Sequence, residues 1–430
     1  MKFYSTRDKA HVVSLQEAVL RGLAPNQGLY MPAELSPLPS QFFRDIKKLT
    51  FEETSLAVAR QVLGSSLDAA TLEAIVHHTV AFDAPLVQLE PDIFSLELYH
   101  GPTLAFKDFG ARFLSGLLGH FARQQAREVV ILAATSGDTG SAVANGFLGV
   151  AGTRVVILYP SGKVSDLQEK QFTTLGAKVT ALEVNGTFDD CQLLVKQAFA
   201  DDQLSSQLFL TSANSINVGR LIPQMFYYFW AFSQLPGHQE KVVVSVPSGN
   251  FGNLTAGIMA QRLGLPVHRF VAATNRNDVV PQYLAGGKFN PRPSISTLSN
   301  AMDVGNPSNV DRLFDLFEHD RNAIARVIKG ASFSDEETAA AIRDVFHQYR
   351  YLLDPHGAVG YLGLKQTLQH GEAGIFLETA HPGKFKEVVE ASAGQTIVLP
   401  ERLQEFVLRQ KQSLPMENSF DSLKRYLLDL

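Results

Sequence analysis

Cysteine is almost absent from this sequence, since Cys191 is the single one in 430 residues. One cysteine cannot form an intramolecular disulfide, and scarce cysteine is typical of a reducing compartment, so we expect a cytoplasmic protein. Cys191 follows Asp190 within a helical pattern, and an acidic neighbour disfavours the thiolate that a reactive cysteine needs. We therefore expect this thiol to be inert.

Long apolar runs and a basic charge excess are also missing. No stretch of about 18 apolar residues occurs, and charges interrupt the N-terminal segment, so we expect neither a membrane-spanning helix nor a signal peptide. The net charge of −5, from 38 basic and 43 acidic residues, indicates no surface for nucleic acid. The glycine fingerprint G-x-G-x-x-G is absent, which argues against a nicotinamide enzyme.

From about residue 97 onward, short β-branched runs alternate with helical patterns. This alternation predicts an α/β fold whose parallel strands are covered by helices on both faces. Ligands of such folds bind beyond the carboxyl ends of the strands. We expect strands at 129–132, 155–158, 179–184, 242–246, 268–273 and 374–377, and helices at 141–147, 165–174, 190–200 and 254–263.

The chain is long for a single core, so several substructures are expected. Residues 1–95 have the pattern of a helical and irregular N-terminal extension. Residues 96–390 are predicted to form the catalytic core of two α/β subdomains, the smaller at about 97–220, and residues 391–430 a helical C-terminal extension. We expect the smaller subdomain to move against the rest when substrate binds.

Two loops at the ends of predicted strands are suited to bind anions. Residues 133–141 (AATSGDTGS) and 247–253 (PSGNFGN) each join a strand to a helix N-terminus, where backbone N–H groups and the helix dipole attract negative charge. An ordinary helix cap has a composition similar to the first loop, and a plain tight turn would explain the second. Two such loops in one chain nevertheless favour a phosphate site.

A lysine stands at an unusual place in a third loop, residues 98–108 (LYHGPTLAFKD). Gly101 and Pro102 indicate a turn, and Asp108 can cap the helix that follows, so Lys107 lies at the helix entrance. The helix dipole disfavours a cation there, and burial would lower the pKa of the amine further. A lowered pKa makes the amine a better nucleophile, although most lysines simply extend into solvent.

Two further loops combine polar groups at the ends of strands. Residues 211–220 (TSANSINVGR) are dense in hydrogen-bond donors, and Arg220 can grip a phosphate or carboxylate with two hydrogen bonds. A capped helix start with a solvated arginine would look similar. Residues 377–384 place the hydroxyl of Thr379 and the imidazole of His381 where a strand ends and a helix begins.

These loops lie within longer motifs that carry a family resemblance over nearly the whole chain. The motifs are GLYMP (28–32), HGPTLAFKDFGARF (100–113), ATSGDTG (134–140), ILYPSGKVSDLQEKQF (157–172), SANSINVGR (212–220), VVSVPSGNFGNLTAG (243–257), LSNAMDVGNPSN (298–309) and TAHPGKF (379–385). Together they resemble the threonine synthase family, in its longer type with N- and C-terminal extensions. This family belongs to the pyridoxal-phosphate (PLP) enzymes built like the tryptophan synthase β subunit.

The resemblance implies the fold of those enzymes (fold type II), with pyridoxal 5′-phosphate held as a Schiff base on Lys107. It implies a hydrogen bond from Thr379 to the pyridine nitrogen of the cofactor. It implies no metal ligands. The residues that would hold the cofactor phosphate are Gly249, Asn250, Phe251, Gly252 and Asn253. Those that would bind the substrate are Thr135, Ser136 and Thr139 for its anions, and Asn214, Ser215 and Arg220 for its phosphate.

The activity implied by the resemblance is that of a PLP-dependent lyase in threonine biosynthesis. Such an enzyme converts the small molecule O-phospho-L-homoserine and water into L-threonine and phosphate, with Lys107 moving the protons at the α and β carbons. A neutral partner at the pyridine nitrogen, Thr379, limits the spread of carbanion charge into the ring and suits replacement chemistry. The alternative is a PLP-dependent phospho-lyase or dehydratase that yields 2-oxobutanoate, ammonia and phosphate.

Two residues depart from the family pattern. Asn253 stands where relatives more often carry an acid, and Asp138 stands where distant PLP enzymes use an asparagine against the 3′-hydroxyl of the cofactor. A silent metabolite-binding protein would have lost Lys107 or the phosphate loop, and both are present. A metalloenzyme is disfavoured, since the spacing of the histidines fits no common ligand pattern. The oligomeric state stays open. The histidines considered are His77, His78, His100, His356 and His381.

Overall fold

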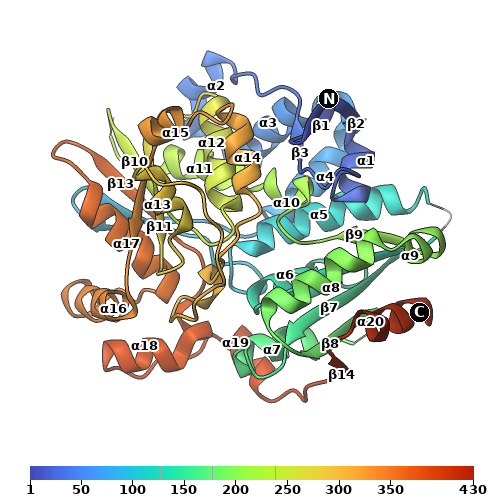
Figure 1. Cartoon of the computed structure of the whole chain (residues 1–430). Coiled ribbons are helices and arrows are strands. Elements are labelled where there is room, and N and C mark those ends of the chain that lie inside the picture. Colours follow the sequence, from blue (N-terminus) through green and yellow to red (C-terminus); the bar gives the residue numbers. More distant parts are fainter. Residues whose placement is uncertain (126, 177, 238) are drawn as a thin grey trace.

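The computed structural model describes residues 1–125, 127–176, 178–237 and 239–430, which form two α/β lobes (Figure 1). One lobe is built on a six-stranded sheet with the order β12-β11-β10-β13-β5-β4. Its strands run parallel except for β4 at the edge, which pairs antiparallel with β5. In chain order the strands are β4 (Leu86–Glu90), β5 (Ile93–Glu97), β10 (Val242–Pro247), β11 (Val267–Thr274), β12 (Ile328–Ser332) and β13 (Ala373–Glu378).

The second lobe is built on a five-stranded parallel sheet with the order β14-β8-β7-β6-β9. Every residue of its strand β6 (VVILAA) is buried, which explains why this strand reads as one continuous apolar run. All six strands predicted from the β-branched runs are present in the two sheets. The strands of this lobe are β6 (Val129–Ala134), β7 (Thr153–Pro160), β8 (Val179–Asn185), β9 (Phe209–Ser212) and β14 (Leu414–Glu417).

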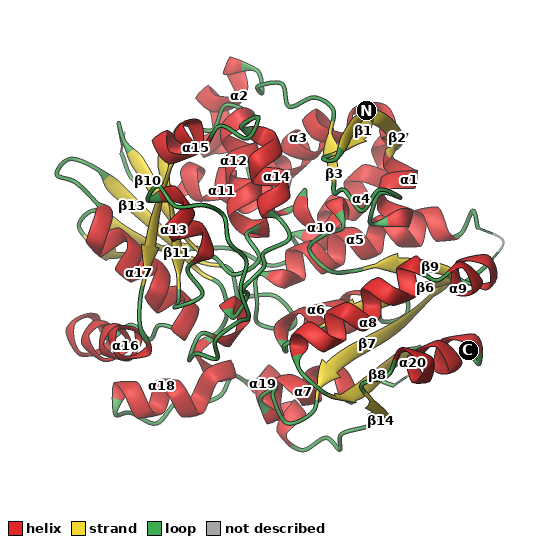
Figure 2. Ribbon diagram, viewed as in Figure 1, coloured by secondary structure: helices red, strands yellow, loops and turns green. Residues whose placement is uncertain are grey.

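Helices surround both sheets (Figure 2), and the four predicted after strands are confirmed with shifted ends. The helix predicted from residue 190 begins at Phe188, because Thr187 and Asp190 form a capping box. The helices of the central region are α5 (Lys107–Ala122), α6 (Asp138–Gly146), α7 (Asp166–Thr173), α8 (Phe188–Ala200), α9 (Asp202–Gln207), α10 (Val218–Leu221), α11 (Gln224–Gln234) and α12 (Gly252–Arg262). Those that follow are α13 (Val279–Leu284), η3 (Asn300–Met302), α14 (Val310–Leu316), α15 (Arg321–Val327), α16 (Asp335–Tyr349) and α17 (Pro355–Thr367).

The first 95 residues contain more β structure than their pattern predicts. β1 (Lys2–Ser5), β2 (Asp8–Ser14) and β3 (Tyr30–Pro32) form an antiparallel sheet, and β4 and β5 join the six-stranded sheet. β2 is mostly exposed and polar, so its alternation is too weak to signal a strand. The helices of this region are α1 (Leu15–Arg21), α2 (Ser40–Asp45), η1 (Ile46–Lys48), α3 (Phe51–Leu63), η2 (Gly64–Ser66) and α4 (Ala69–Thr79).

The C-terminal segment, which we expected to be helical, also contains a strand. Its strand β14 (LPME) pairs with β8, and most of its side chains are exposed, so a pairing partner rather than a local pattern makes it a strand. In Figure 1 the segment passes from the first lobe to the second and ends beside β8. Its helical elements are η4 (Pro382–Phe385), α18 (Lys386–Ala393), α19 (Glu401–Val407) and α20 (Phe420–Leu428).

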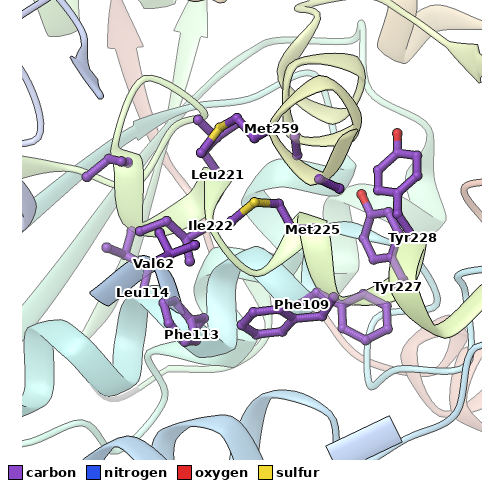
Figure 3. Close-up of a cluster of buried hydrophobic side chains, with 14 of the residues drawn as sticks. Val62, Phe109, Phe113, Leu114, Leu221, Ile222, Met225, Tyr227, Tyr228 and Met259 are labelled. Atoms are coloured by element: carbon purple, nitrogen blue, oxygen red, sulfur yellow. The ribbon is translucent and has the colours of Figure 1, made fainter. Parts of the chain in front are cut away.

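A buried apolar cluster locks the N-terminal helices to the centre of the chain (Figure 3). It joins α3, α5, α10, α11 and α12, so the N-termini of α5 and α12 are held in fixed relation to each other. The labelled members are Val62, Phe109, Phe113, Leu114, Leu221, Ile222, Met225, Tyr227, Tyr228 and Met259.

Two other observations bear on the sequence predictions. Cys191 is fully buried, and burial raises the pKa of its thiol to about 12, so the expected inertness is confirmed. Over the residues that the structure describes, no helix has both the length and the apolar character needed to cross a lipid bilayer.

Candidate active site

Loops from both sheets meet at one cavity. The segments after β6 and β9 reach it from the five-stranded sheet, and those after β10 and β13 reach it from the six-stranded sheet, as expected for carboxyl ends of parallel strands. Of the thirteen residues that the sequence assigns to cofactor or substrate, twelve line this cavity: Lys107, Ser136, Thr139, Asn214, Ser215, Arg220, Gly249, Asn250, Phe251, Gly252, Asn253 and Thr379.

Thr135 is the exception. Its side chain is fully buried and turns into its own loop, where Oγ1 accepts hydrogen bonds from the backbone N–H groups of Gly137 and Gly140 at 2.9 and 2.7 Å. It is not among the lining residues of the cavity. In this structure Thr135 therefore shapes the loop that presents Ser136 and Thr139.

Lys107 begins α5 and is largely withdrawn from solvent, with 15% of its side chain exposed. Burial lowers the pKa of its amine to about 8, an effect that the nearby carboxylate of Asp138 opposes and the cations of Lys384 and Arg220 reinforce. The predicted lowering is thus confirmed, and the amine is poised to be neutral or charged near physiological pH.

The helix entrance beside Lys107 differs from the predicted cap. Phe106 is the N-cap residue of α5, and Asp108 lies within its first turn. The Asp108 carboxylate instead accepts hydrogen bonds from the N–H and the hydroxyl of Thr103, at 2.8 and 2.6 Å. Asp108 thus fixes the turn before the lysine, because its side chain points back along the chain.

Backbone pairing places Phe106, the residue before Lys107, opposite Thr379. The carbonyl of Thr379 accepts a 2.9 Å hydrogen bond from the N–H of Phe106, and the carbonyl of Leu104 accepts a 3.0 Å bond from the N–H of His381. The segment after β5 therefore continues alongside the segment after β13. The two residues that the sequence assigns to opposite ends of the cofactor are held in register by this pairing.

The loop after β10 has the geometry of an anion cradle. Phe251 adopts a left-handed conformation (φ 60°) at the N-cap of α12, a position that non-glycine residues rarely take. A Cβ atom on Gly249 would lie 2.7 Å from the Cα of Met302, so only glycine allows this close approach. Gly252 and Asn253, the first two residues of α12, line the cavity.

Asn253 adds an oriented donor to this cradle. Its Oδ1 accepts hydrogen bonds from the buried hydroxyls of Tyr227 and Tyr228, at 2.8 and 2.7 Å. Its Nδ2 is buried and has no hydrogen-bond partner within the described residues. An unsatisfied buried donor at a helix N-terminus fits a bound phosphate, so the residues present suit the PLP phosphate.

Arg220 supplies a second buried donor that has no hydrogen-bond partner among the described residues. Its Nη1 donates a 2.6 Å hydrogen bond to the carbonyl of Ala213, whereas its buried Nε lacks a partner in the part of the chain that the structure describes. Burial lowers the pKa of this guanidinium to about 10, which still leaves it charged. Gly110 makes room for it, since a Cβ there would lie 2.7 Å from Nε. Arg220 is therefore a buried cation that lines the cavity.

Some residues of the site have no clear signal in the sequence. His356 lines the cavity, and its ring contacts the Asp354 carboxylate through Nδ1 at 2.5 Å and accepts from the N–H of Ala301 through Nε2. Asp354 caps α17, with Pro355 at the first helical position, a cap pattern that could have located this helix. Lys384 is fully buried and contacts Asp138 at 2.7 Å.

The histidines considered as metal ligands have other partners. His77 contacts Glu52 at 3.0 Å on the surface, and His100 contacts Glu97 at 2.8 Å. Burial lowers the pKa of His381 to about 4, so this ring is neutral near pH 7. Across residues 1–125, 127–176, 178–237 and 239–430, no three His, Cys, Asp or Glu side chains are grouped to hold a metal ion.

The fold and the site suit one class of protein: an α/β enzyme whose cavity combines a buried lysine with a cradle for an anionic cofactor. Comparison with known proteins agrees with this class. Residues 81–377 match the family described as "Pyridoxal-phosphate dependent enzyme". Residues 2–80 match "Threonine synthase N terminus", and residues 357–427 match "Threonine synthase, C-terminal".

The chain is 48% identical to the threonine synthase of Escherichia coli (strain K12) over 94% of each chain. Its fold is similar to the crystal structure of threonine synthase from Escherichia coli, with a TM-score of 0.95 and complete coverage of both chains. It is also similar to a PLP-bound threonine synthase from Brucella melitensis, with 35% identity, a TM-score of 0.92 and coverage of 99% and 98%.

The chain belongs to the threonine synthase family of PLP-dependent enzymes. The family, the fold class, the lyase class and the PLP cofactor that the sequence predicts are thereby confirmed. Threonine synthase is also the predicted function, and full-length relatives at 45% to 48% identity carry it.

Proposed function

We propose that this enzyme converts O-phospho-L-homoserine and water into L-threonine and phosphate, with Lys107 as its catalytic residue. One observation carries the proposal: two separate sets of groups suited to anions line the same cavity as the buried amine of Lys107. The α12 cradle suits the cofactor phosphate, and Arg220 with its neighbours suits the phosphate of a substrate. A substrate that carries its own phosphate explains why the cavity needs both.

PLP bound to Lys107 supplies an electron sink that lets protons leave the α and β carbons of the substrate and lets the γ-phosphate depart. The residues that would hold the cofactor are Lys107, the loop Gly249–Asn253 and Thr379. Backbone amides of the loop and Asn253 Nδ2 would bind its phosphate, and the Thr379 hydroxyl would face its ring nitrogen. A neutral hydroxyl there keeps the nitrogen unprotonated, which favours replacement at the side chain over reactions that need full charge delocalisation.

Lys107 would move the protons of the reaction. Its pKa of about 8 lies near physiological pH, so the amine can accept a proton and return it without a large free-energy cost. Burial of most of the Lys107 side chain, of which 15% is exposed, limits the exchange of that proton with bulk water. The same amine would also carry the cofactor, so that one lysine of the cavity would serve both roles.

The substrate would be oriented by its charges. Arg220, Asn214 and Ser215 would take the γ-phosphate, and Ser136 and Thr139 at the N-terminus of α6 would take the carboxylate. The free amides and the dipole of α6 favour an anion there. Opposed binding of the two anionic ends fixes the α and β carbons beside Lys107.

The decisive experiment supplies the purified enzyme with O-phospho-L-homoserine and measures phosphate, L-threonine and 2-oxobutanoate together. We expect threonine and phosphate in equal amounts, with loss of both in Lys107→Ala. Phosphate accompanied by 2-oxobutanoate and ammonia instead of threonine would replace this proposal by the dehydratase alternative. Retained turnover in Lys107→Ala would remove the lysine from its role.

Three further points stay predictions. The division of the chain at residues 95 and 390 is proposed from the sequence pattern. A cytoplasmic location is supported by the single cysteine, and a negative net charge supports the absence of nucleic acid as a partner.

A further inference from the structure

Asp138 lies between two buried ammonium groups. Its Oδ1 is 2.7 Å from Nζ of Lys384, and its Oδ2 is 3.9 Å from Nζ of Lys107. The amide of Gln168 also donates to Oδ1, at 2.9 Å. One carboxylate oxygen is thus held by Lys384 and Gln168, and the other faces the catalytic amine.

Lys384 is held in place as firmly as Asp138. None of its side chain is exposed, and Nζ donates a second hydrogen bond, of 2.7 Å, to the carbonyl of Thr103. Thr103 belongs to the turn that Asp108 holds in place before Lys107. Lys384 itself lies in η4, a few residues after Thr379, so it is anchored to both loops that flank the cofactor site.

The charges around Lys107 come from every neighbouring element. Asp138 on α6 and Asp354 before α17 favour its protonated form, whereas Lys384 in η4 and Arg220 on α10 disfavour it. Asp108 on α5 and His381 after β13 lie near Lys384. Burial alone would raise the pKa of Asp138, but Lys384 and Lys107 hold it well below its usual range, so the carboxylate stays ionised.

Without Lys384, the ionised Asp138 would have Lys107 as its one nearby cation among the described residues. A buried carboxylate with a single cation pairs closely with it and strongly favours its protonated form. A permanently protonated lysine can neither attack the cofactor nor remove a proton from the substrate. Lys384 prevents this by sharing the carboxylate.

We propose that Lys384 is a positioning residue that holds the Asp138 carboxylate away from Lys107 and thereby sets the protonation state of the nitrogen on which PLP is carried. Asp138 in turn offsets the positive charge of Lys384, so that the Lys107 nitrogen can still take up a proton. Lys384, Asp138 and Lys107 therefore act as one buried charge triad. This inference rests on the proposed role of Lys107 and assigns a function to Asp138, the residue that departs from the asparagine of distant relatives.

The test is a pH titration of the visible absorbance of the PLP-loaded enzyme in four variants. Lys384→Met should move the titration midpoint upward, by roughly one pH unit or more, because Asp138 then pairs with the Lys107 nitrogen alone. Asp138→Asn should move it downward by a similar amount. The double variant should fall between the two, and Lys384→Arg should stay close to wild type.

A second readout avoids turnover altogether. The rate at which the apoenzyme takes up PLP at pH 7 requires a neutral Lys107 amine, so Lys384→Met should load several-fold more slowly and Asp138→Asn faster. Identical midpoints in wild type and Lys384→Met would overturn the proposal. A Lys384→Met variant without a cooperative thermal transition would not be folded, and Asp138→Asn would then be the deciding variant. An unchanged or raised titration midpoint in Asp138→Asn would likewise refute the proposal.

The controls separate this inference from the proposed function. A visible band of the wild-type enzyme that borohydride removes, and that Lys107→Ala lacks, establishes the cofactor on Lys107. Absence of that band would overturn the proposed role of Lys107 and this inference with it. A normal band with unmoved midpoints would refute the role of Lys384 alone.

Discussion

Asn250 donates a 2.6 Å hydrogen bond from Nδ2 to the Oγ of Ser215, and this bond joins the loops of the two sheets. Asn309 reinforces it by donating to the same Oγ and to the carbonyl of Asn250, at 3.2 and 3.0 Å. The fully buried Arg312 donates to the carbonyls of Ser215 and Tyr30. The proposed cofactor loop and substrate loop therefore form one hydrogen-bonded unit, which the N-terminal region also contacts.

Replacing Ser215 with alanine tests this unit. The change removes the acceptor shared by Asn250 and Asn309, and we expect both the PLP dissociation constant and the KM to rise by roughly three- to tenfold, as for loss of about 1 kcal/mol of hydrogen bonding. Titration of the apoenzyme with PLP and steady-state kinetics measure the two constants. The exposed Ser206 on α9 supplies a matched control. An altered KM with an unaltered PLP affinity would mean that the loops are not coupled.

Arg220→Ala should affect the substrate far more than the cofactor. Arg220 lines the cavity and its buried Nε is an unsatisfied charged donor, and loss of such a donor costs about 1.5 to 3 kcal/mol, or roughly 10- to 150-fold in kcat/KM. The PLP dissociation constant should stay within about twofold of wild type. Arg326→Ala, on the exposed surface of α15, is the control. Equal losses of PLP and substrate affinity would contradict the assignment of Arg220 to the substrate phosphate.

The pKa of Lys107 predicts a pH dependence for cofactor uptake. The neutral amine is the nucleophile, and its fraction rises about tenfold per pH unit below the pKa of about 8 and levels off above it. Stopped-flow mixing of apoenzyme with PLP from pH 6 to pH 9.5 measures the rate. A surface lysine would give a rate that still rises at pH 9.5, and that result would show that Lys107 is not desolvated in solution.

The tyrosine pair on α11 should control PLP affinity through Asn253. Tyr227→Phe and Tyr228→Phe each remove one hydrogen bond to Asn253 Oδ1, so the amide is free to turn its donor away from the phosphate. We expect each change to weaken PLP binding several-fold and the double change to weaken it more than either. Tyr283→Phe, on α13, serves as the comparison. An unshifted ³¹P resonance of bound PLP in the double variant would argue against a phosphate contact by Asn253.

The core strands and the loops that follow them could be read from the sequence because the signal is local. β6, β7 and β10 are continuous β-branched runs bounded by loops rich in glycine and hydroxyl residues, and both features are visible along the chain. The strands β2 and β14 are polar and largely exposed, and β1 has only four residues, so no clear periodic pattern marks the three strands. They are strands because another segment pairs with them.

The residues of the candidate site likewise fall into two groups: those that a local sequence pattern marks and those that only the fold brings together. The motif around Lys107, the glycine turn at Gly249 and the donor-rich segment ending at Arg220 each show a chemistry in a few consecutive residues. The buried residues that contact these groups have no such local signal. Lys384 contacts Asp138 from far along the chain, and Thr135 faces its own loop although it belongs to the same motif as Ser136. A side chain's direction depends on backbone geometry that composition does not reveal.

The sequence by itself therefore determined which strands and helices form the core of the two lobes, which loops can bind anions and which lysine is chemically unusual, because these follow from propensities and spacing over a few residues. Only the tertiary structure decided how far the pKa of that lysine is lowered and how its partners are oriented. Both depend on burial and on distances between charges that the fold brings together, such as those from Asp138 to Lys107 and Lys384. Electrostatic energies in a buried site vary steeply with those distances, and sequence separation does not fix them.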